Sequence, residues 1–244
     1  MTKLRDYQLE LLDLLLAFDK ICSERDVRWW LDSGSLLGAV RHKGFIPWDD
    51  DLDVCVLGSD YPKIKKALQD CPEPYHFQCS LKEEETRLFP RFIDKSKTFK
   101  RIDPHSGKEI EVHPWIDVFV LRETSLKFKK KFDPFYGRCL RRVNGSIRDG
   151  LPKSLAGWLG APAAFITKET ALLCGKLAHK GELTHDFGVP FYSLRRLEDI
   201  LPLGKIEFEG LEFPAPANPD HYLRLIYGDY MKEERSDSQH KIIL

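Results

Sequence analysis

The feature that most restricts the fold of this chain is a run of four aspartates within five positions, placed directly before an apolar segment. Asp49, Asp50, Asp51 and Asp53 repel one another, yet the residues at 54–57 are Val-Cys-Val-Leu. Alternation of acidic and apolar residues is typical of a strand, so Asp51 and Asp53 are expected on one face. At about 3.3 Å per residue their Cα atoms lie roughly 6.6 Å apart, and carboxylates can converge from there onto one hard cation. Mg²⁺ suits such a pair best, because it takes one or two carboxylates and adds water and phosphate oxygens.

A small-residue turn precedes these acids. Val27–Leu31 is strand-like, Gly34-Ser35 follows, and Leu36–Arg41 is typical of a short helix. A helix N-terminus after a glycine turn offers free backbone N–H groups to a phosphate. Gly-Ser or Asp-x-Asp alone is most often a solvated turn. Together they predict phosphoryl transfer, in which a protein mainly positions groups and stabilises charge.

The string SLLGAVRHKGFIPWDDDLD, from Ser35 to Asp53, resembles one branch of the nucleotidyltransferase superfamily. This branch is the LicD-type phosphotransferases, typified by the cholinephosphotransferases of lipopolysaccharide and teichoic acid. The fukutin-related ribitol-phosphate transferases are more distantly similar. Trp115–Phe119 and Pro214–Met231 resemble two further family segments, so the similarity extends over nearly the whole chain.

The resemblance implies transfer of a phospho-alcohol, first of all phosphocholine, from a CDP-linked donor such as CDP-choline, with release of CMP. The implied acceptor is a sugar hydroxyl of a cell-surface glycan or a lipid-linked glycan precursor. The implied cofactor is Mg²⁺, with Mn²⁺ as its substitute. Asp51 and Asp53 would hold the metal with Asp49 as a further ligand, and Gly34 and Ser35 would hold a donor phosphate.

Asp117 is predicted to be the third acid of the site. It alternates with Trp115 and Phe119 on one face of an apolar strand, where a charge is costly unless it is paired or bound to a metal. It is expected either to complete the metal site or to act as base toward the acceptor hydroxyl. The alternative is an acid paired in a strand salt bridge.

Three further residues are candidate substrate contacts. Arg41 can bind a phosphate through two parallel hydrogen bonds, or simply balance nearby carboxylates. Arg91 is a candidate phosphate contact, with an ordinary strand arginine as the alternative. Trp48 is expected to wall the pocket. A quaternary ammonium group could be held by cation–π contacts from one or more of four tryptophans: Trp29, Trp30, Trp48 and Trp115.

The expected fold is α/β (α+β in detail), with a mixed, mostly antiparallel, nucleotidyltransferase-like sheet flanked by helices. With 244 residues, 42% of them hydrophobic, the chain is expected to form one domain, 1–244. Helices are predicted at 4–25, 59–69, 161–177, 194–200 and 219–227. Strands are predicted at 27–31, 75–80, 88–93, 98–102 and 112–121, with a hairpin at 205–213. A C-terminal cap is expected at about 205–231.

The segment 122–180 is expected to be a basic helical insertion. It carries 13 Lys and Arg and 4 acids, a net charge of +9, in a chain whose formal net charge is zero. Aromatic residues lie between the cations. Three interpretations remain open: a solvated helical face, an interfacial segment that contacts anionic lipids, and a site for an anionic glycan.

Composition excludes several classes of protein. A net charge of zero gives no case for nucleic-acid binding. The 6 cysteines lack paired spacing, which favours a reduced compartment. The N-terminus is polar, and no apolar run reaches the roughly 20 residues that span a bilayer. The chain is therefore predicted to be cytoplasmic, with a peripheral position at the inner face of the membrane as the further option.

Other functions remain as alternatives. A transferase of the same fold could move glycerol- or ribitol-phosphate, or a nucleotidyl group. A glycosyltransferase could use Asp-x-Asp for a nucleotide-sugar, but Gly34-Ser35 so close upstream argues against it. A non-catalytic membrane- or glycan-binding protein is disfavoured by the intact set of acids.

Overall fold

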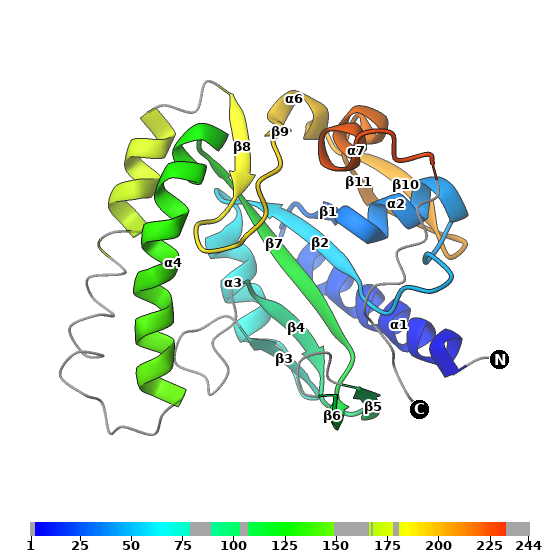
Figure 1. Cartoon of the computed structure of the whole chain (residues 1–244). Helices are drawn as coiled ribbons and strands as arrows, with labels where there is room; N and C mark the ends of the chain where they lie inside the picture. The colour runs from blue at the N-terminus through cyan, green and yellow to red at the C-terminus, as the bar shows by residue number, and fades with distance from the viewer. Residues whose placement is uncertain are drawn as a thin grey trace.

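A curled mixed sheet forms the centre of the structure, a computed structural model that describes residues 3–78, 89–102, 107–148, 166, 168–177 and 181–232 (Figure 1). In this part of the chain the sheet has 7 strands. The order of neighbouring strands is β1 (Trp30–Leu31), β2 (Asp53–Leu57), β7 (Trp115–Glu123), β4 (Arg91–Asp94) and β3 (Tyr75–Gln78). Two further strands branch from β7: β8 (Glu182–His185) pairs with β7, and β9 (Arg195–Arg196) pairs with β8. The described pair β2–β7 is parallel and the others are antiparallel, which confirms the predicted mixed, mostly antiparallel sheet.

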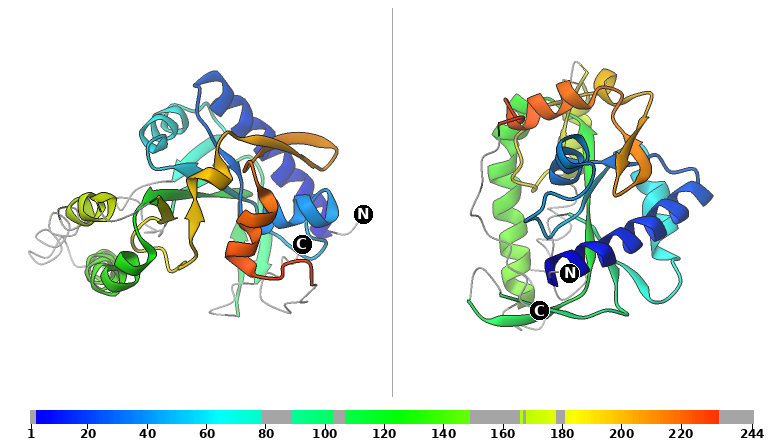
Figure 2. Two further views of the ribbon diagram at one scale, coloured as in Figure 1. Left: turned by 90° about the horizontal axis from the view of Figure 1, so that it is seen from above. Right: turned by 90° about the vertical axis from the view of Figure 1, so that its right-hand side faces the viewer.

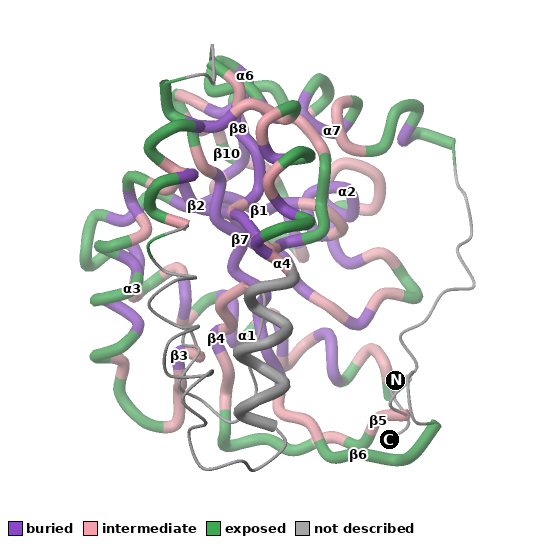
Figure 3. Tube along the Cα trace, turned by 60° about the vertical axis from the view of Figure 1, so that its left-hand side comes forward, coloured by how far each residue is buried: buried purple, intermediate pink, exposed green. Residues whose placement is uncertain are grey.

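The central strands are the most deeply buried part of the fold. All residues of β2 and most of β7 are buried, as the purple colour of these strands shows (Figure 3). α1 (Lys3–Glu24) contacts β4 and β7, and α3 (Tyr61–Gln69) contacts β3 and α1 (Figure 2). The helix predicted at 4–25 is confirmed, and the apolar residues that recur at helical spacing are buried: Tyr7, Leu11, Leu14, Leu15, Phe18 and Cys22.

Several predicted boundaries were wrong. The strand expected at 27–31 is reduced to β1. The helix expected from Leu36 is α2 (Ser33–His42), which begins three residues earlier. The long strand expected at 112–121 is divided between β6 (Glu109–Val112) and β7, since Pro114 lacks the N–H that would continue the ladder. Of the strands at 75–80 and 88–93, residues 79–88 lie outside the described part.

The acidic segment also differs from expectation. β2 begins at Asp53, so Asp51 lies just before the strand rather than in it. The N–H of Asp53 donates to the hydroxyl of Ser35 at 2.8 Å, and the carbonyl of Asp53 accepts the N–H of Asp32 at 3.1 Å. These bonds join the first turn of α2 to the start of β2.

The hairpin and the helix predicted in the C-terminal segment are both present. β10 (Gly204–Phe208) and β11 (Leu211–Ala215) form a hairpin whose turn residues, Glu209 and Gly210, have φ of 56° and 77°. Such a pair of positive φ angles matches the twist of paired strands. α7 (Pro219–Tyr227) begins where the side chain of Asn218 accepts the N–H of His221 at 3.1 Å. α6 (Leu197–Ile200) is shorter than expected, and α7 packs against both α6 and α2.

The basic insertion is anchored by a buried cation. α4 (Leu126–Arg148) contains Lys129, whose side chain is 0% exposed. Its ammonium pairs with Asp133 and donates to the carbonyls of Asp186 at 3.0 Å and Val189 at 2.9 Å. Residues 168–177 form a second helix beside α4. Elsewhere in the chain, β5 (Phe99–Ile102) pairs antiparallel with β6 in a separate two-stranded sheet. The rest of the helix predicted at 161–177, apart from the helical residue 166, lies outside the described residues.

We expect Lys129→Met to destabilise the fold by about 3–5 kcal/mol, the cost of leaving a buried carboxylate without its partner. Asp133 would stay buried, and two carbonyls would lose their donor. Urea unfolding measures the effect. The control is Lys130→Met, because Lys130 is exposed on the same helix and its replacement should change stability by less than about 0.5 kcal/mol. Equal unfolding midpoints for the two variants would contradict the prediction.

Candidate functional site

Three charged side chains lie in a row across the central strands. Asp53 of β2 is in register with Asp117 of β7, and Asp117 is in register with Arg91 of β4. Residues directly opposite on neighbouring strands present their side chains to the same face. The Nε of Arg91 donates to Oδ1 of Asp117 at 2.6 Å. The sheet therefore joins three residues that the sequence singled out separately.

The first turn of α2 faces the same acids. A Cβ added to Gly34 would lie 3.1 Å from Oδ2 of Asp49, 3.7 Å from Oδ2 of Asp53 and 3.9 Å from Oδ1 of Asp51. The glycine thus keeps open the space between the helix N-terminus and the carboxylates. Ser35 is 5% exposed and its hydroxyl already accepts the N–H of Asp53, so it links α2 to β2.

Burial and mutual repulsion disfavour ionisation of these acids. Burial, followed by the charge of Asp51, raises the pKa of Asp49 to about 8. Burial also raises the pKa of Asp53, with added repulsion from Asp51 and Asp117. Burial raises the pKa of Asp117 too, although the Arg91 guanidinium opposes that rise. At neutral pH the group needs either protons or a cation.

Carboxylate oxygens are donors that Mg²⁺ accepts when a ligand and water supply the remaining oxygens. Among the described residues, no three Asp, Glu, His or Cys side chains are arranged to enclose a metal by themselves. Mg²⁺ does not require such a cage, because one or two carboxylates with water and phosphate oxygens satisfy it. Asp51 and Asp53 provide that pair beside Gly34, and Asp49 lies next to them. Asp117 is instead turned to Arg91.

We expect Mg²⁺ to stabilise the protein more at pH 8.5 than at pH 6. An unfolded aspartate ionises near pH 4, whereas folded Asp49 keeps its proton to about pH 8. Between these values the folded state binds more protons, so stability without metal falls as pH rises. Mg²⁺ takes the place of the proton. Thermal unfolding in MgCl₂ and in EDTA at matched ionic strength measures this, with Asp49→Asn as control. The same shift at both pH values would contradict the prediction.

Arg41 and Trp48 lie toward the other end of α2. Seven residues separate Gly34 from Arg41 on this helix, a rise of about 10 Å. The ring of Trp48 meets that of His42 edge-on at 6.3 Å between centroids, and Trp48 is 37% exposed. Arg41 thus lies well away from Gly34 along the helix, whereas Trp48 directly precedes Asp49, whose carboxylate lies beside Gly34.

The structure separates the four tryptophans that could hold a quaternary ammonium group. Trp29 and Trp30 are buried in the core, and their indole N–H groups donate to Asp19 and Tyr222, each at 3.2 Å. Trp115 is 7% exposed. The guanidiniums of Arg91 and Arg101 lie 4.5 and 5.5 Å from its ring centroid. Trp48 alone of the four has a substantially exposed ring.

Sequence reasoning missed a buried network that ties the cap to the site. The hydroxyl of Tyr222 donates to Oδ1 of Asp32 at 2.7 Å, and both residues are fully buried. Arg195, also fully buried, lies over the Tyr222 ring at 4.9 Å. Asp32 directly precedes α2, so the network sets the position of the helix relative to α7. The partners lie 190 residues apart, and no local pattern signals such a contact.

Tyr227 is the second residue that was missed. Its hydroxyl is hydrogen-bonded to Ser33, while its side chain remains 44% exposed. Burial of the hydroxyl raises its pKa, and the charges of Asp53 and Asp32 add to the rise. Tyr227, the last residue of α7, thus lies close enough to Asp53 and Asp32 to be affected by their charges, and it is partly exposed to solvent. Its position at a helix end was visible in the sequence, but its direction was not.

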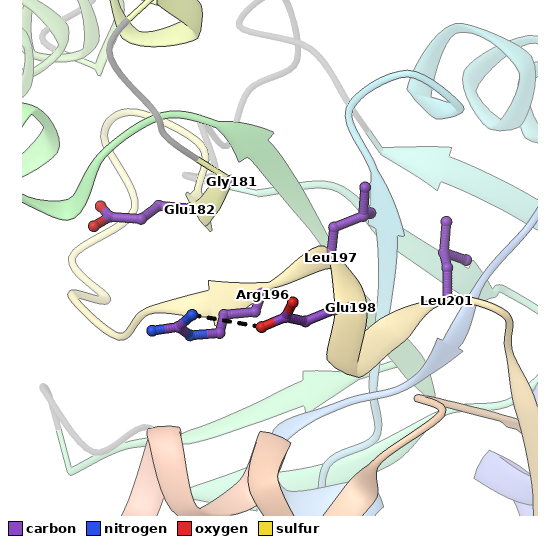
Figure 4. A pocket seen from close by; sticks show the side chains of 6 residues that line it. All are labelled: Gly181, Glu182, Arg196, Leu197, Glu198 and Leu201. Atoms are coloured by element: carbon purple, nitrogen blue, oxygen red, sulfur yellow. Dashed lines mark hydrogen bonds and ion pairs between the residues drawn. The ribbon is translucent and has the colours of Figure 1, made fainter.

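Two described cavities lie away from the acids. One, of about 500 Å³, is lined by Gly181, Glu182, Arg196, Leu197, Glu198 and Leu201 (Figure 4). The other, of about 370 Å³, includes Leu57 and Leu121. Leu57 ends β2, whereas Asp53 begins it. These cavities therefore lie toward the opposite end of the central strands from the carboxylates.

The sequence of this chain is similar to several known proteins. A model of the LicD/FKTN/FKRP nucleotidyltransferase domain matches residues 26–138, which include α2, the acids, Arg91 and Asp117. The lipopolysaccharide cholinephosphotransferase LicD of Haemophilus influenzae is 28% identical over 255 residues, which cover 97% of this chain and 94% of that protein. The ribitol 5-phosphate transferase FKRP of Homo sapiens is 56% identical over 34 residues, 14% of this chain and 7% of that protein.

Proposed function

We propose that this chain is a phosphotransferase of the LicD family, whose nucleotidyltransferase-domain model matches residues 26–138. In the proposed reaction a phospho-alcohol passes from a CDP-linked donor to a glycan hydroxyl, and CMP is released. Phosphocholine is the proposed group and CDP-choline the proposed donor, because the relative that matches most of the chain is named a cholinephosphotransferase. The observation that carries the proposal is the meeting of three carboxylates with the glycine turn of α2.

Each part of the site has a proposed task. The backbone N–H groups at the start of α2 hold a donor phosphate beside Gly34. Asp51 and Asp53, with Asp49 next to them, hold Mg²⁺. When bound, Mg²⁺ supplies positive charge that offsets the charge of the diphosphate. The glycine turn matters because a side chain at Gly34 would occupy the space for that phosphate.

Asp117 is the proposed base. The acceptor hydroxyl gives its proton to Asp117, and its oxygen forms a bond to the phosphorus that bears the alcohol. The bond from that phosphorus to the bridging oxygen breaks, and CMP leaves with the electron pair. Arg91 donates to Asp117 at 2.6 Å and favours its ionised form, which a base requires.

The proposed acceptor is a sugar of lipopolysaccharide or of a related lipid-linked glycan precursor, by analogy with the named function of the Haemophilus influenzae relative. Teichoic acid is the alternative cell-surface acceptor. We place the reaction in the cytoplasm, with a peripheral contact at the inner face of the membrane. None of the helices in the described part combines the length and apolar character needed to cross a bilayer.

Product analysis tests the function. The protein is incubated with an acceptor glycan, MgCl₂ and, in turn, CDP-choline, CDP-glycerol, CDP-ribitol and CTP. CMP released with one CDP-alcohol, together with phosphate on the glycan, supports the proposal and identifies the alcohol. Pyrophosphate from CTP would indicate nucleotidyl transfer instead. Absence of any nucleotide product, with unchanged cellular function of Asp51→Asn, would favour a non-catalytic binding protein.

We expect Trp48→Ala to weaken CDP-choline binding about 5- to 30-fold, the loss of one cation–π contact of about 1–2 kcal/mol. CDP-glycerol has no cation, so its affinity should remain unchanged. Titration calorimetry in MgCl₂ measures both, and Trp48→Phe should keep part of the affinity. An equal loss for the two donors would mean that Trp48 shapes the pocket and does not select choline.

A further inference from the structure

The outer layer of the molecule consists of α4 and the helix at 168–177, which lie side by side along one edge of the sheet (Figures 1 and 2). On the inner side, several of the described side chains are packed against the rest of the fold. Tyr136 and Ala171 are buried together with Phe187 in a small second core. A Cβ on Gly175 would lie 2.0 Å from Oγ1 of Thr124, so the second helix rests directly on the segment that leads into α4.

This packing corrects part of the interfacial interpretation. Under the interfacial interpretation, one of the three left open by the sequence, the aromatic residues among the cations would enter a lipid surface. Phe128, Phe132 and Tyr136 instead pack with Phe187 in the second core. Lys129 is buried as well. The side chains of these two helices that remain accessible to a lipid surface are those that point outward.

The second helix and the helical residue 166 before it carry exposed apolar side chains. Ile166, Leu173 and Leu177 are 62%, 63% and 84% exposed. They are spaced by seven and four positions, so they share one side of a helix. The inner side has its own apolar residues, Ala171 and Leu172. Ile166, Leu173 and Leu177 therefore form an outer apolar stripe that takes no part in packing the second core. Scattered exposed leucines are ordinary, but an aligned set of this kind marks an interaction surface.

The neighbouring helix presents cations. Lys127, Lys130 and Lys131 are exposed on α4, and Phe135, one turn beyond Lys131, is 49% exposed. Within the described residues none of these three lysines forms an ion pair with an acidic side chain. In contrast, other cations of the insertion pair with acidic side chains: Arg122 and Lys168 pair with the largely buried Asp186 at 3.4 and 2.8 Å, and Lys176 pairs with Glu123 at the surface at 3.5 Å.

We propose that this outer surface, formed by Lys127, Lys130, Lys131, Phe135, Ile166, Leu173 and Leu177, docks on a lipid bilayer that contains anionic headgroups. The lysines would meet the headgroups, and the apolar side chains would enter the boundary between headgroups and acyl chains. The residues 122–180 carry a net charge of +9 in a neutral chain, so attraction to an anionic surface would orient the molecule with this layer toward it.

The outer surface combines positive charge with apolar side chains, and an anionic bilayer matches both properties better than the other candidate partners do. A second copy of the chain would bring the same lysines face to face. A soluble anionic glycan would satisfy the lysines but leave Leu173 and Leu177 in water. Anionic lipid satisfies both. Docking does not require transferase activity, so the docking proposal and the proposed function can be tested separately. If both hold, docking would bring the enzyme close to its lipid-linked acceptors.

The test is co-sedimentation of the full chain with vesicles of phosphatidylcholine alone or mixed with phosphatidylglycerol. We expect binding to the anionic vesicles that weakens as salt rises, because salt screens the lysines. Leu173→Ser/Leu177→Ser and Lys130→Glu/Lys131→Glu should each lower partitioning about tenfold or more. The matched control is Lys65→Glu/Lys66→Glu, which makes the same charge change at exposed positions of α3. It should bind like the wild type.

Three results would overturn the proposal. The wild type could fail to bind anionic vesicles at low salt. The α3 control could lose as much binding as the α4 variant, which would indicate attraction by net charge alone. Sedimentation equilibrium could show a dimer that Leu173→Ser/Leu177→Ser abolishes, which would assign the stripe to self-association. Vesicle binding without CMP release from any CDP-alcohol would leave docking in place and refute the proposed function.

Discussion

Asp53→Asn should abolish phospho-alcohol transfer while making the protein more stable in the absence of metal. Asp53 is 8% exposed, and burial together with Asp51 and Asp117 raises its pKa. The amide has the same shape without the charge, so it relieves the repulsion but binds a divalent cation poorly. We expect a rate loss of at least about 10²–10³-fold, as when one electrostatic stabiliser is removed from an enzyme.

Two measurements separate the effects of Asp53→Asn. Initial rates of CMP release report function, and urea unfolding in EDTA reports stability. Asp26→Asn is the control, because the Asp26 side chain is 98% exposed and neither quantity should change. A variant that loses both activity and stability would identify Asp53 as a structural acid. Unchanged activity would remove the Asp-x-Asp pair from the mechanism.

Arg91→Met should destabilise the fold by about 3–5 kcal/mol, because it leaves a buried carboxylate without its partner. The side chains of Arg91 and Asp117 are 14% and 10% exposed, so solvent screens the pair little. Arg91→Lys should restore only part of the loss, since an ammonium lacks both the planar fork and the stacking on Trp115. The double variant Arg91→Met/Asp117→Asn should recover stability relative to Arg91→Met alone.

The same variants test the role of Asp117 in the reaction. Arg91 lowers the pKa of Asp117, so Arg91→Met raises that pKa. If Asp117 is the base, it must be ionised to act. The acid limb of the rate profile of Arg91→Met should then move to higher pH. Chemical denaturation and the pH dependence of kcat/KM provide the measurements. Additive effects of Arg91→Met and Asp117→Asn on stability would contradict the ion pair. An acid limb that stays at the same pH in Arg91→Met would contradict the role of Asp117 as base.

Features that depend on a few neighbouring residues could be read from the sequence. The apolar stripe of α1 predicted a helix that packs on the sheet. Glu209-Gly210 predicted the turn of the cap hairpin, and Asn218 predicted the start of α7. The juxtaposition of Gly34 with the acids was also foreseeable, because the turn and the acids lie within twenty residues of each other.

Side-chain environment was predicted less well. Trp29, Trp30 and Trp115 were indistinguishable from Trp48 as partners for a ligand cation, because an aromatic residue suits a core and a pocket equally. Lys129 looked like one solvated cation among many, yet it is buried with Asp133. Burial depends on what packs against a residue, and those neighbours are distant in the chain.

The sequence by itself determined the candidate chemistry of this protein: the acids, the glycine turn, the local elements that carry them and the motifs that resemble the LicD-type phosphotransferases. Only the tertiary structure decided how these parts meet. It set Asp53 beside Asp117 and Asp117 beside Arg91, pairs that are 64 and 26 residues apart. It also placed Tyr222 and Tyr227 of the cap against Asp32 and Ser33. The reason is that strand register and helix packing minimise the free energy of the whole core, whereas a local pattern specifies only one face of one element.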